Sequence, residues 1–273
     1  MPGWREFRSA GGGALTCAEY SDRFSERFTG RVESYRQFRP RYPDAVVGLL
    51  EKECGLTPSS TIADIAAGTG LLAEIFLARG YEVIAVEPND EMRAACETLV
   101  ERYPKLRCVA GAAETTELPS HSFDLITVGQ ALHWFDLRRT RAEFARILRP
   151  DGWCAVIYNE RRLGVDDFHD GYERLLRKFG IDYEVVQRQH QTLSQIQGFF
   201  APGEMRHADF PNAQFLTLEA LEGRIISSSY MPKPEHARYA AMRTAIANLF
   251  KKHQENGRVR LKYDCSVSYG QLV

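Results

Sequence analysis

Short apolar runs alternate with amphipathic segments along the first part of the chain. The runs have the length of strands, and between them apolar residues recur every three or four positions, as on one face of a helix. This pattern predicts strands at residues 61–65, 82–86, 106–110, 123–129 and 153–158, and helices at residues 44–54, 70–79, 89–101 and 137–148. Strands that are apolar on both faces are typical of a parallel sheet covered by helices on both sides.

The pattern changes at about residue 160. A polar, helical stretch comes first and is followed by two strand-like stretches with helices between them. The predicted helices cover residues 166–200, 218–229 and 235–253, and the predicted strands cover residues 205–217 and 258–269. Two late strands that follow a parallel core favour an antiparallel hairpin at the edge of the sheet.

These elements predict an α/β fold with a doubly wound, mostly parallel, seven-stranded sheet of the Rossmann-like kind, a C-terminal antiparallel hairpin and a helical insertion. Residues 1–27 contain a run of glycines and little hydrophobic periodicity, so we expect a flexible segment there. We expect one domain over residues 28–273, with a ligand-binding core at 44–160 and the helical insertion and terminal strands at 161–273. The sequence Arg149-Pro-Asp-Gly152 predicts a turn.

Composition narrows the choice of partners. The 273 residues include 35 basic and 36 acidic side chains, a net charge of −1, so neither a nucleic acid nor an anionic membrane is expected as a partner. No apolar run approaches the roughly 20 residues that span a bilayer, and the N-terminus lacks the apolar core of a secretory signal. The six cysteines are scattered, which favours reduced thiols, no metal site and a cytoplasmic location.

A turn of small residues between the first two strands carries the chemistry. Asp64-Ile-Ala-Ala-Gly-Thr-Gly70 leads from strand to helix, and Glu87 follows the second strand. Strand, glycine turn, helix, strand and acid form a nucleotide-binding half-site, in which Glu87 can accept hydrogen bonds from ribose hydroxyls. Because Gly68-Thr-Gly-Leu-Leu-Ala73 also fits the dinucleotide pattern, an NAD(P)-dependent oxidoreductase is one interpretation.

Three features favour a different nucleotide. Asp64 stands beside the expected ligand, where a carboxylate suits a positive charge and a dinucleotide has no general need for one. The third strand leads into Gly111-Ala-Ala-Glu114, a small-residue turn with an acid that suits the edge of an adenine. No second nucleotide-binding half follows residue 160.

Over residues 28–160 the chain resembles the class I S-adenosylmethionine-dependent methyltransferases, and within them the methyltransferase 11/25 type. The resemblance rests on Asp64–Gly70, Val86-Glu-Pro-Asn-Asp-Glu-Met92, Ala112-Ala-Glu114, Phe123-Asp-Leu-Ile-Thr-Val128 and Leu148-Arg-Pro-Asp-Gly152. Ala66 stands where the family has its first glycine. A methyl group is tolerable at this position only if the backbone keeps an ordinary φ, so the affinity for the cofactor depends on the conformation of Ala66.

The resemblance implies that S-adenosyl-L-methionine is the cofactor. Asp64 and the backbone of residues 66–70 would hold its methionine end, Glu87 its ribose, and Gln130 would line the sulfonium side. Met92 would pack on the adenine, and Ala113 and Glu114 would contact the adenine edge. The cofactor-binding set is therefore Asp64, Ala66, Gly68, Gly70, Glu87, Pro88, Met92, Ala113, Glu114 and Gln130.

The sequence also suggests residues for the site of the methyl acceptor. Methyl transfer needs a general base only when the acceptor must lose a proton; His133 is the candidate base, and Tyr35 is a second catalytic candidate in a lid over the cofactor. Trp134, Phe135 and Asn159 are expected in the substrate pocket. The absence of an Asn/Asp-Pro-Pro-aromatic motif after the fourth strand, together with the balanced charge, favours a small-molecule acceptor.

Residues 160–257 are expected to shape the acceptor site and to offer a homodimer contact. A third interpretation, besides methyltransferase and oxidoreductase, is a protein that binds S-adenosylmethionine without turnover. Its basis is Ala66 together with the lack of an unmistakable catalytic base.

Overall fold

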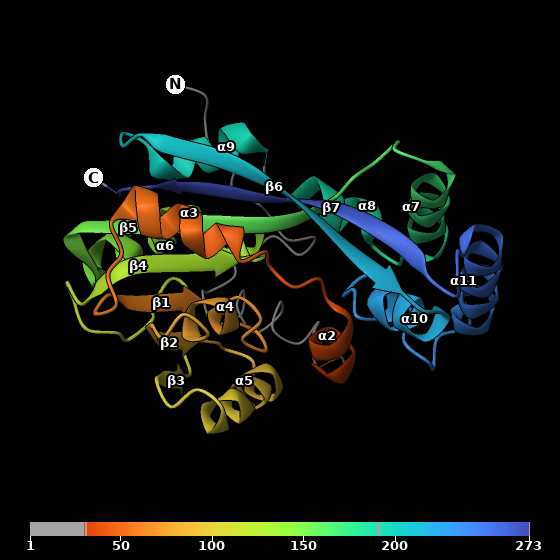
Figure 1. Cartoon of the computed structure of the whole chain (residues 1–273), viewed down its shortest axis with the longest axis horizontal. Coiled ribbons are helices and arrows are strands. Elements are labelled where there is room, and N and C mark those ends of the chain that lie inside the picture. The colour runs from red at the N-terminus through yellow and green to blue at the C-terminus, as the bar shows by residue number, and fades with distance from the viewer. Residues whose placement is uncertain (1–29, 31, 190–191, 273) are drawn as a thin grey trace, which may run out of the picture.

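The computed structural model describes residue 30, residues 32–189 and residues 192–272. These residues build one seven-stranded sheet flanked by helices (Figure 1). The predicted flexible segment, residues 1–27, lies outside the described residues.

The sheet has the order β3-β2-β1-β4-β5-β7-β6. Five strands run parallel: β1 (Thr61–Ile65), β2 (Glu82–Val86), β3 (Leu106–Val109), β4 (Phe123–Gly129) and β5 (Leu148–Arg161). The last two, β6 (Met205–Leu216) and β7 (Val259–Gly270), pair antiparallel to each other, and β7 also pairs antiparallel to β5. The chain moves outward from β1 to β3 and then returns to place β4 on the other side of β1. Ligands of doubly wound sheets bind at this reversal, outside the carboxyl ends of the strands.

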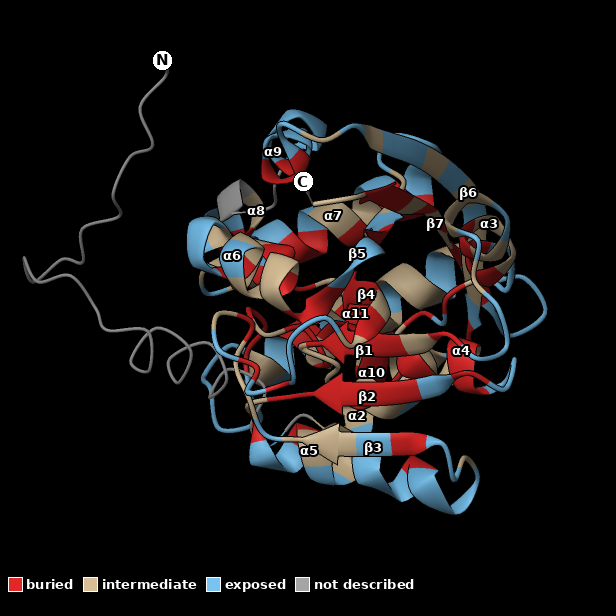
Figure 2. Cartoon of the chain, turned by 90° about the vertical axis from the view of Figure 1, so that its left-hand side faces the viewer, coloured by how far each residue is buried: buried red, intermediate tan, exposed pale blue. Residues whose placement is uncertain are grey.

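Both faces of the sheet are covered, which explains the near-continuous apolar strands. One core cluster joins one face of the sheet to α3 (Ala45–Cys54), α4 (Ala73–Leu77) and α5 (Asp90–Glu97), which continues as a 3₁₀ turn over Thr98–Glu101. A second cluster joins the other face to α6 (Leu137–Ile147) and α9 (Leu193–Phe200). The central strands therefore lie almost wholly buried (Figure 2).

The long strands β6 and β7 extend past the parallel strands and carry a third apolar cluster, which lies at the right of Figure 1. It contains α7 (Asp167–Phe179), α8 (Tyr183–Gln189), α10 (Leu218–Ile226) and α11 (Tyr239–His253). The N-terminal helix α2 (Val32–Phe38) packs against α10. Gly223 on α10 permits this approach, because a Cβ there would lie 2.1 Å from the ring of Phe38.

The predicted fold class is confirmed, including the mostly parallel sheet and the antiparallel C-terminal strands. One local prediction is wrong. Residues 149–152 are not a free turn but part of β5, where they form an irregularity opposite β4: Leu148 pairs with Phe123, and Trp153 pairs with Leu125. Arg149 is fixed there by an ion pair with Asp124, 2.5 Å from Nη1 to Oδ1.

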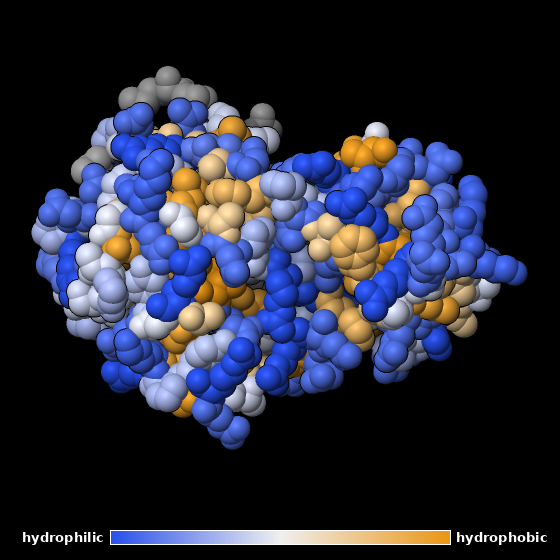
Figure 3. All heavy atoms as spheres, in the orientation of Figure 1, coloured by the Kyte–Doolittle hydropathy of each residue, from blue (hydrophilic) through white to orange (hydrophobic). Residues whose placement is uncertain are grey.

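Hydrophilic side chains cover most of the face in Figure 3, with hydrophobic ones scattered between them. Within the described ranges, no helix is both long and apolar enough to cross a membrane. Within the same ranges, no three His, Cys, Asp or Glu side chains are grouped to hold a metal ion. The cytoplasmic location and the homodimer contact stay predictions.

Candidate active site

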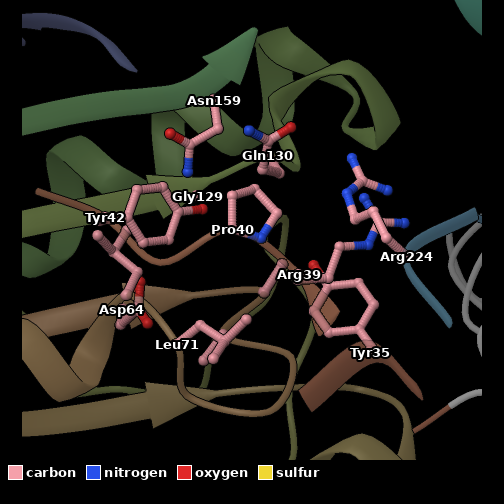
Figure 4. A pocket seen from close by; sticks show the side chains of 13 residues that line it. Tyr35, Arg39, Pro40, Tyr42, Asp64, Leu71, Gly129, Gln130, Asn159 and Arg224 are labelled. Carbon is pink, nitrogen blue, oxygen red and sulfur yellow. The ribbon is translucent and has the colours of Figure 1, made fainter. Parts of the chain in front are cut away.

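A cavity lies at the carboxyl ends of β1, β4 and β5, where the chain reverses across the sheet. The space between its walls is about 480 Å³, counted with the part that opens to solvent. The walls come from the N-terminal segment, the β1 turn, the ends of β4 and β5, and α10 (Figure 4). The lining residues are Tyr35, Arg39, Pro40, Tyr42, Asp64, Ala66, Ala67, Leu71, Leu72, Gly129, Gln130, Asn159 and Arg224.

Asp64 provides an acidic group at one end of the cavity. It is 1% exposed, and its Oδ1 accepts a hydrogen bond of 2.8 Å from the hydroxyl of Thr127 on β4. Its Oδ2 is buried and has no hydrogen-bond partner among the described residues. Burial raises the pKa of Asp64 to about 7, and the nearby charge of Glu87 acts in the same direction. A buried carboxylate oxygen without a donor is costly unless a ligand supplies one.

The turn after β1 is left-handed at three positions. The φ angles are 54° at Ala66, 58° at Gly68 and 82° at Gly70. Gly70 cannot carry a side chain, since a Cβ would lie 2.7 Å from Cδ1 of Leu99 and 2.8 Å from Sγ of Cys96. The condition of an ordinary φ is therefore not met at Ala66, which adopts the backbone shape that glycine favours at a steric cost.

Glu87, directly after β2, ties this turn to the neighbouring strand. Its Oε2 accepts a 2.8 Å hydrogen bond from the backbone N–H of Gly68, and its Oε1 accepts a 2.9 Å bond from the N–H of Asn89. Glu87 is buried, and burial raises its pKa. A carboxylate has about four acceptor positions, so Glu87 can accept further hydrogen bonds from a ligand.

Seven of the ten predicted cofactor residues do not line this cavity, namely Gly68, Gly70, Glu87, Pro88, Met92, Ala113 and Glu114. Met92 and Ala113 are buried in the protein. Glu114 accepts a 2.8 Å hydrogen bond at Oε1 from the backbone N–H of Asp136, which connects the loop after β3 to the start of α6. Asp64, Ala66 and Gln130 do line the cavity, and the binding roles of all ten stay predictions.

The segment after β4 divides into two parts. Gln130 lines the cavity in a left-handed conformation, with a φ of 59°. His133, Trp134 and Phe135 do not line it. His133 lies in a 3₁₀ turn with its Nδ1 3.2 Å from the hydroxyl of Tyr158, and its ring centroid is 4.3 Å from that of Trp134. The proton-transfer role of His133 stays a prediction.

The N-terminal segment forms the opposite wall. The predicted residue Tyr35 lies on α2 and lines the cavity, and the guanidinium of Arg39 stacks on its ring, 4.7 Å from the centroid. Asn159, which also lines the cavity, belongs to a network that holds this segment in place. Asn212 donates from Nδ2 to Oδ1 of Asn159 and to the carbonyl of Arg41, at 2.8 Å in both cases.

Arg224 is a lining residue that the sequence reasoning missed. It is 3% exposed on α10 and donates from Nε to the hydroxyl of Tyr263 at 3.1 Å. The sequence does contain a signal for it. Leu221, Arg224 and Ile225 recur at helical spacing, which places an arginine on the apolar face of its helix.

The sheet order, the glycine turn after β1, Asp64 near the end of β1 and Glu87 after β2 define a nucleotide-binding α/β protein. Comparison with known proteins identifies the family. Residues 63–156 match the model of a methyltransferase domain. The chain is 31% identical over 217 residues to an uncharacterized methyltransferase of Mycobacterium bovis. This alignment covers 79% of this chain and 81% of that protein. It is 28% identical over 241 residues to an uncharacterized methyltransferase-like protein of Schizosaccharomyces pombe, covering 86% and 91% of the two chains.

A solved structure agrees with this relation at the level of the fold. The structure of a putative type II methyltransferase from Anaeromyxobacter dehalogenans aligns with a TM-score of 0.64 at 24% identity, covering 86% of this chain and 99% of that one. The chain therefore belongs to the methyltransferase family. It is an S-adenosylmethionine-dependent methyltransferase, and S-adenosyl-L-methionine is its cofactor. The methyltransferase prediction is confirmed, and the oxidoreductase and non-catalytic interpretations are set aside.

The residues present fit this cofactor. S-Adenosylmethionine is positively charged at its sulfonium and ammonium groups, and Asp64 Oδ2 is a buried acceptor that lacks a donor. The turn at residues 66–70 has the left-handed backbone that brings main-chain groups close to a ligand. Glu87 has the acceptor capacity that two ribose hydroxyls need.

Proposed function

We propose that the protein transfers the methyl group of S-adenosylmethionine to a small-molecule acceptor bound in the cavity between Asp64 and the N-terminal segment. One observation carries the proposal. The lining includes Asp64, whose buried Oδ2 has no hydrogen-bond partner in the described part of the chain, as well as Tyr35 on α2 and Arg224 on α10. A concave site of this kind, at the carboxyl ends of the strands, suits a small molecule.

In this proposal, Asp64 binds the positively charged methionine end of the cofactor and Glu87 binds the ribose. Burial strengthens both interactions, because little water competes for the carboxylates. The bound cofactor supplies an electrophilic methyl group on a sulfonium, so the protein mainly needs to align the acceptor and exclude water. Tyr35 and Arg39, which cover the cavity from the N-terminal side, contribute to that exclusion.

The cavity walls favour an acceptor that needs no proton removed. Among the lining residues, the ionisable groups near Asp64 include Tyr42, and burial raises the pKa of Tyr42 well above its ordinary value. A phenol of that kind stays protonated at neutral pH and does not act as a base. His133 is not among the lining residues. We therefore favour an acceptor atom that is already nucleophilic at neutral pH.

Calorimetry and product detection test this function together. We expect S-adenosylmethionine and S-adenosylhomocysteine to bind, NADH to show no binding, and S-adenosylhomocysteine to form when a panel of small acceptors is added. The panel should contain hydroxyl, carboxyl, amine and thiol compounds, with transfer RNA and a denatured protein as macromolecular controls. Methylation of a macromolecule but of no small molecule would contradict the proposal.

A further inference from the structure

Three arginines gather in the interior beside the proposed acceptor site. Arg39, Arg161 and Arg224 influence one another or the same buried tyrosines, Tyr172 and Tyr230. Arg39 and Arg224 line the cavity, and their guanidinium groups lie next to each other at the end opposite Asp64 (Figure 4). Buried guanidinium groups are normally paired with carboxylates, because removing their charge from water is costly.

Only Arg161 of these three has such a partner in the described part of the chain. Its Nη2 lies 3.4 Å from Oε2 of Glu173. Arg39 donates from Nη2 to the carbonyl of Ser227 at 2.9 Å, while its buried Nε has no acceptor. Among the described residues, the hydrogen bonds of the Arg224 guanidinium go to neutral acceptors, the hydroxyls of Tyr263 and Ser228. Two positive charges therefore face this end of the cavity, and no carboxylate of the described residues pairs with either of them.

The excess of positive charge lowers the pKa values of nearby side chains. Arg224 lowers the pKa of Arg39, in addition to the larger effect of burial. The charges of Arg161, Arg224 and Arg39 lower the pKa of Tyr230 although burial opposes them. The interior at this end of the cavity is therefore a favourable place for an anion.

The cofactor accounts for at most one of the two charges. S-Adenosylmethionine has a single carboxylate, and one guanidinium can bind it. Asp64 lies at the other end of the cavity (Figure 4), where it would face the cationic part of the cofactor. One guanidinium remains to be matched after the cofactor is bound, and the acceptor is the other molecule that enters this space.

We propose that the methyl acceptor is an organic anion whose carboxylate or phosphate group binds between Arg39 and Arg224, with Arg224 as the main specificity-determining residue. This inference rests on the proposed function and adds the chemical class of the acceptor. The anionic group pairs with a guanidinium that is held rigidly by Tyr263 and Ser228, so little ordering is required when it binds. It also orients the acceptor in the cavity that contains Asp64.

The test begins with anion binding to the complex of the protein with S-adenosylhomocysteine. Citrate and succinate serve as carboxylate probes, glycerol 3-phosphate as the phosphate probe, and succinamide and glycerol as the matched neutral compounds. We expect at least one anionic probe to raise the melting temperature in a saturable way and the neutral compounds to have no effect. If a carboxylate probe raises the melting temperature, the acceptor group is a carboxylate; if only glycerol 3-phosphate does so, it is a phosphate.

Variants then assign the effect to the arginines. For Arg224→Gln, we expect the affinity for the effective anion to fall about 10- to 100-fold, as for the loss of a charged hydrogen bond, and the affinity for S-adenosylhomocysteine to change less than about threefold. Arg39→Gln and Arg39→Lys provide a second pair if Arg224→Gln does not fold, and Lys should retain more affinity than Gln. Arg243→Gln, which removes a half-exposed arginine paired with Glu222 on the surface, is the charge-matched control.

Two results would overturn the inference while leaving the proposed function intact. One is that no anionic probe stabilises the wild-type complex more than it stabilises the arginine variants. The other is that both Arg39→Gln and Arg224→Gln weaken S-adenosylhomocysteine itself, which would assign both charges to the cofactor. Failure of the wild type to bind S-adenosylhomocysteine would instead contradict the proposed function.

Discussion

Asp64 combines a cost to stability with a use in binding. Its pKa of about 7 lies above the 3.8 of an unperturbed aspartate, so the folded protein holds this proton more tightly than the unfolded chain. The free energy of unfolding consequently decreases as pH rises from about 4 to about 7, and the whole cost is present above that range. In the proposed function, the same ionised group binds the cationic end of the cofactor.

Replacing Asp64 with Asn should separate these two effects. At pH 8 we expect Asp64→Asn to raise the free energy of unfolding of the ligand-free protein by about 2–4 kcal/mol, and to have little effect near pH 4. We also expect S-adenosylmethionine to bind at least about tenfold more weakly. Thermal denaturation at the two pH values and calorimetry measure these changes.

The pH dependence of binding provides the control for this substitution. Because Asp64 must lose its proton to pair with a cation, the affinity of the wild type for S-adenosylmethionine should fall between pH 7.5 and pH 6. The affinity of Asp64→Asn should stay flat over that range. A wild type whose affinity did not depend on pH would contradict the role given to this carboxylate.

Ala66 shows how a departure from a glycine pattern affects the backbone. It keeps the left-handed φ of 54° that the first glycine of the motif would adopt. Ala66→Gly should therefore raise the free energy of unfolding by about 1 kcal/mol, as measured by urea denaturation. Ala67→Gly is the matched control, because Ala67 has no positive φ; it should lower the stability through the greater freedom of the unfolded chain.

His133 provides a test of proton transfer. Its ring lies against Tyr158 and Trp134 rather than along the cavity wall. We expect His133→Ala to lower turnover less than about tenfold, whereas loss of a general base costs roughly 100-fold or more. A larger drop, with unchanged affinity for S-adenosylhomocysteine, would restore the predicted role as base. Tyr158→Phe, which removes the hydroxyl beside the ring, is the control.

The positions of Asp64 and Glu87 could be predicted from the sequence better than those of Arg39 and Arg224. Asp64 lies near the end of β1 and Glu87 directly follows β2, and both strands have a clear apolar pattern, so the place of the two acids at one edge of the sheet could be predicted. Arg39 and Arg224 meet only because α2 packs on α10, a contact between segments far apart in the chain. No local pattern contains that information, although the position of Arg224 on an apolar helix face was a usable sign.

Among the elements, α2 and α10 decide the shape of the acceptor end. They touch where Gly223 leaves room for the ring of Phe38, and the carbonyl of Phe38 accepts a 2.9 Å hydrogen bond from Nε2 of Gln214 on β6. Tyr263 donates to Gln214 at 2.7 Å and accepts from Arg224. The position of α2 is thus coupled to that of Arg224.

Gly223→Ala should disturb this contact. A Cβ at 2.1 Å from the ring of Phe38 forces α2 away from α10, so we expect a loss of about 1–3 kcal/mol in the free energy of unfolding. We also expect weaker acceptor binding, with a smaller effect on S-adenosylhomocysteine, because Tyr35 and Arg39 move with the helix. Gly198→Ala on α9 is the matched control. No atom lies within 4 Å of its Cβ position, so it should be neutral or slightly stabilising.

The residue ranges predicted from the sequence agree best with the structure for strands that are buried on both faces of the sheet. The strand predicted at residues 123–129 coincides with β4, whereas the helix predicted at residues 70–79 is limited to Ala73–Leu77. The irregular pairing at residues 149–152 could not be predicted from proline and glycine alone. It depends on the register that β5 adopts beside β4, which is a property of two strands together.

The molecule as a unit separates two kinds of charge in one cavity. Asp64 faces it from the parallel half of the sheet, whereas Arg39 faces it from just after α2 and Arg224 from α10. A cationic donor and an anionic acceptor would then bind at opposite ends, with the methyl group between them. The net charge of −1 does not reveal this arrangement, because it arises from the placement of a few buried groups.

The structure of the protein with S-adenosylhomocysteine bound tests this account most directly. We predict that the amino-acid end of the ligand lies at Asp64 Oδ2, that its ribose hydroxyls contact Glu87, and that its sulfur faces the part of the cavity lined by Gln130 and Arg224. A ligand bound away from the turn at residues 66–70, or one that leaves Asp64 Oδ2 without a donor, would contradict the account.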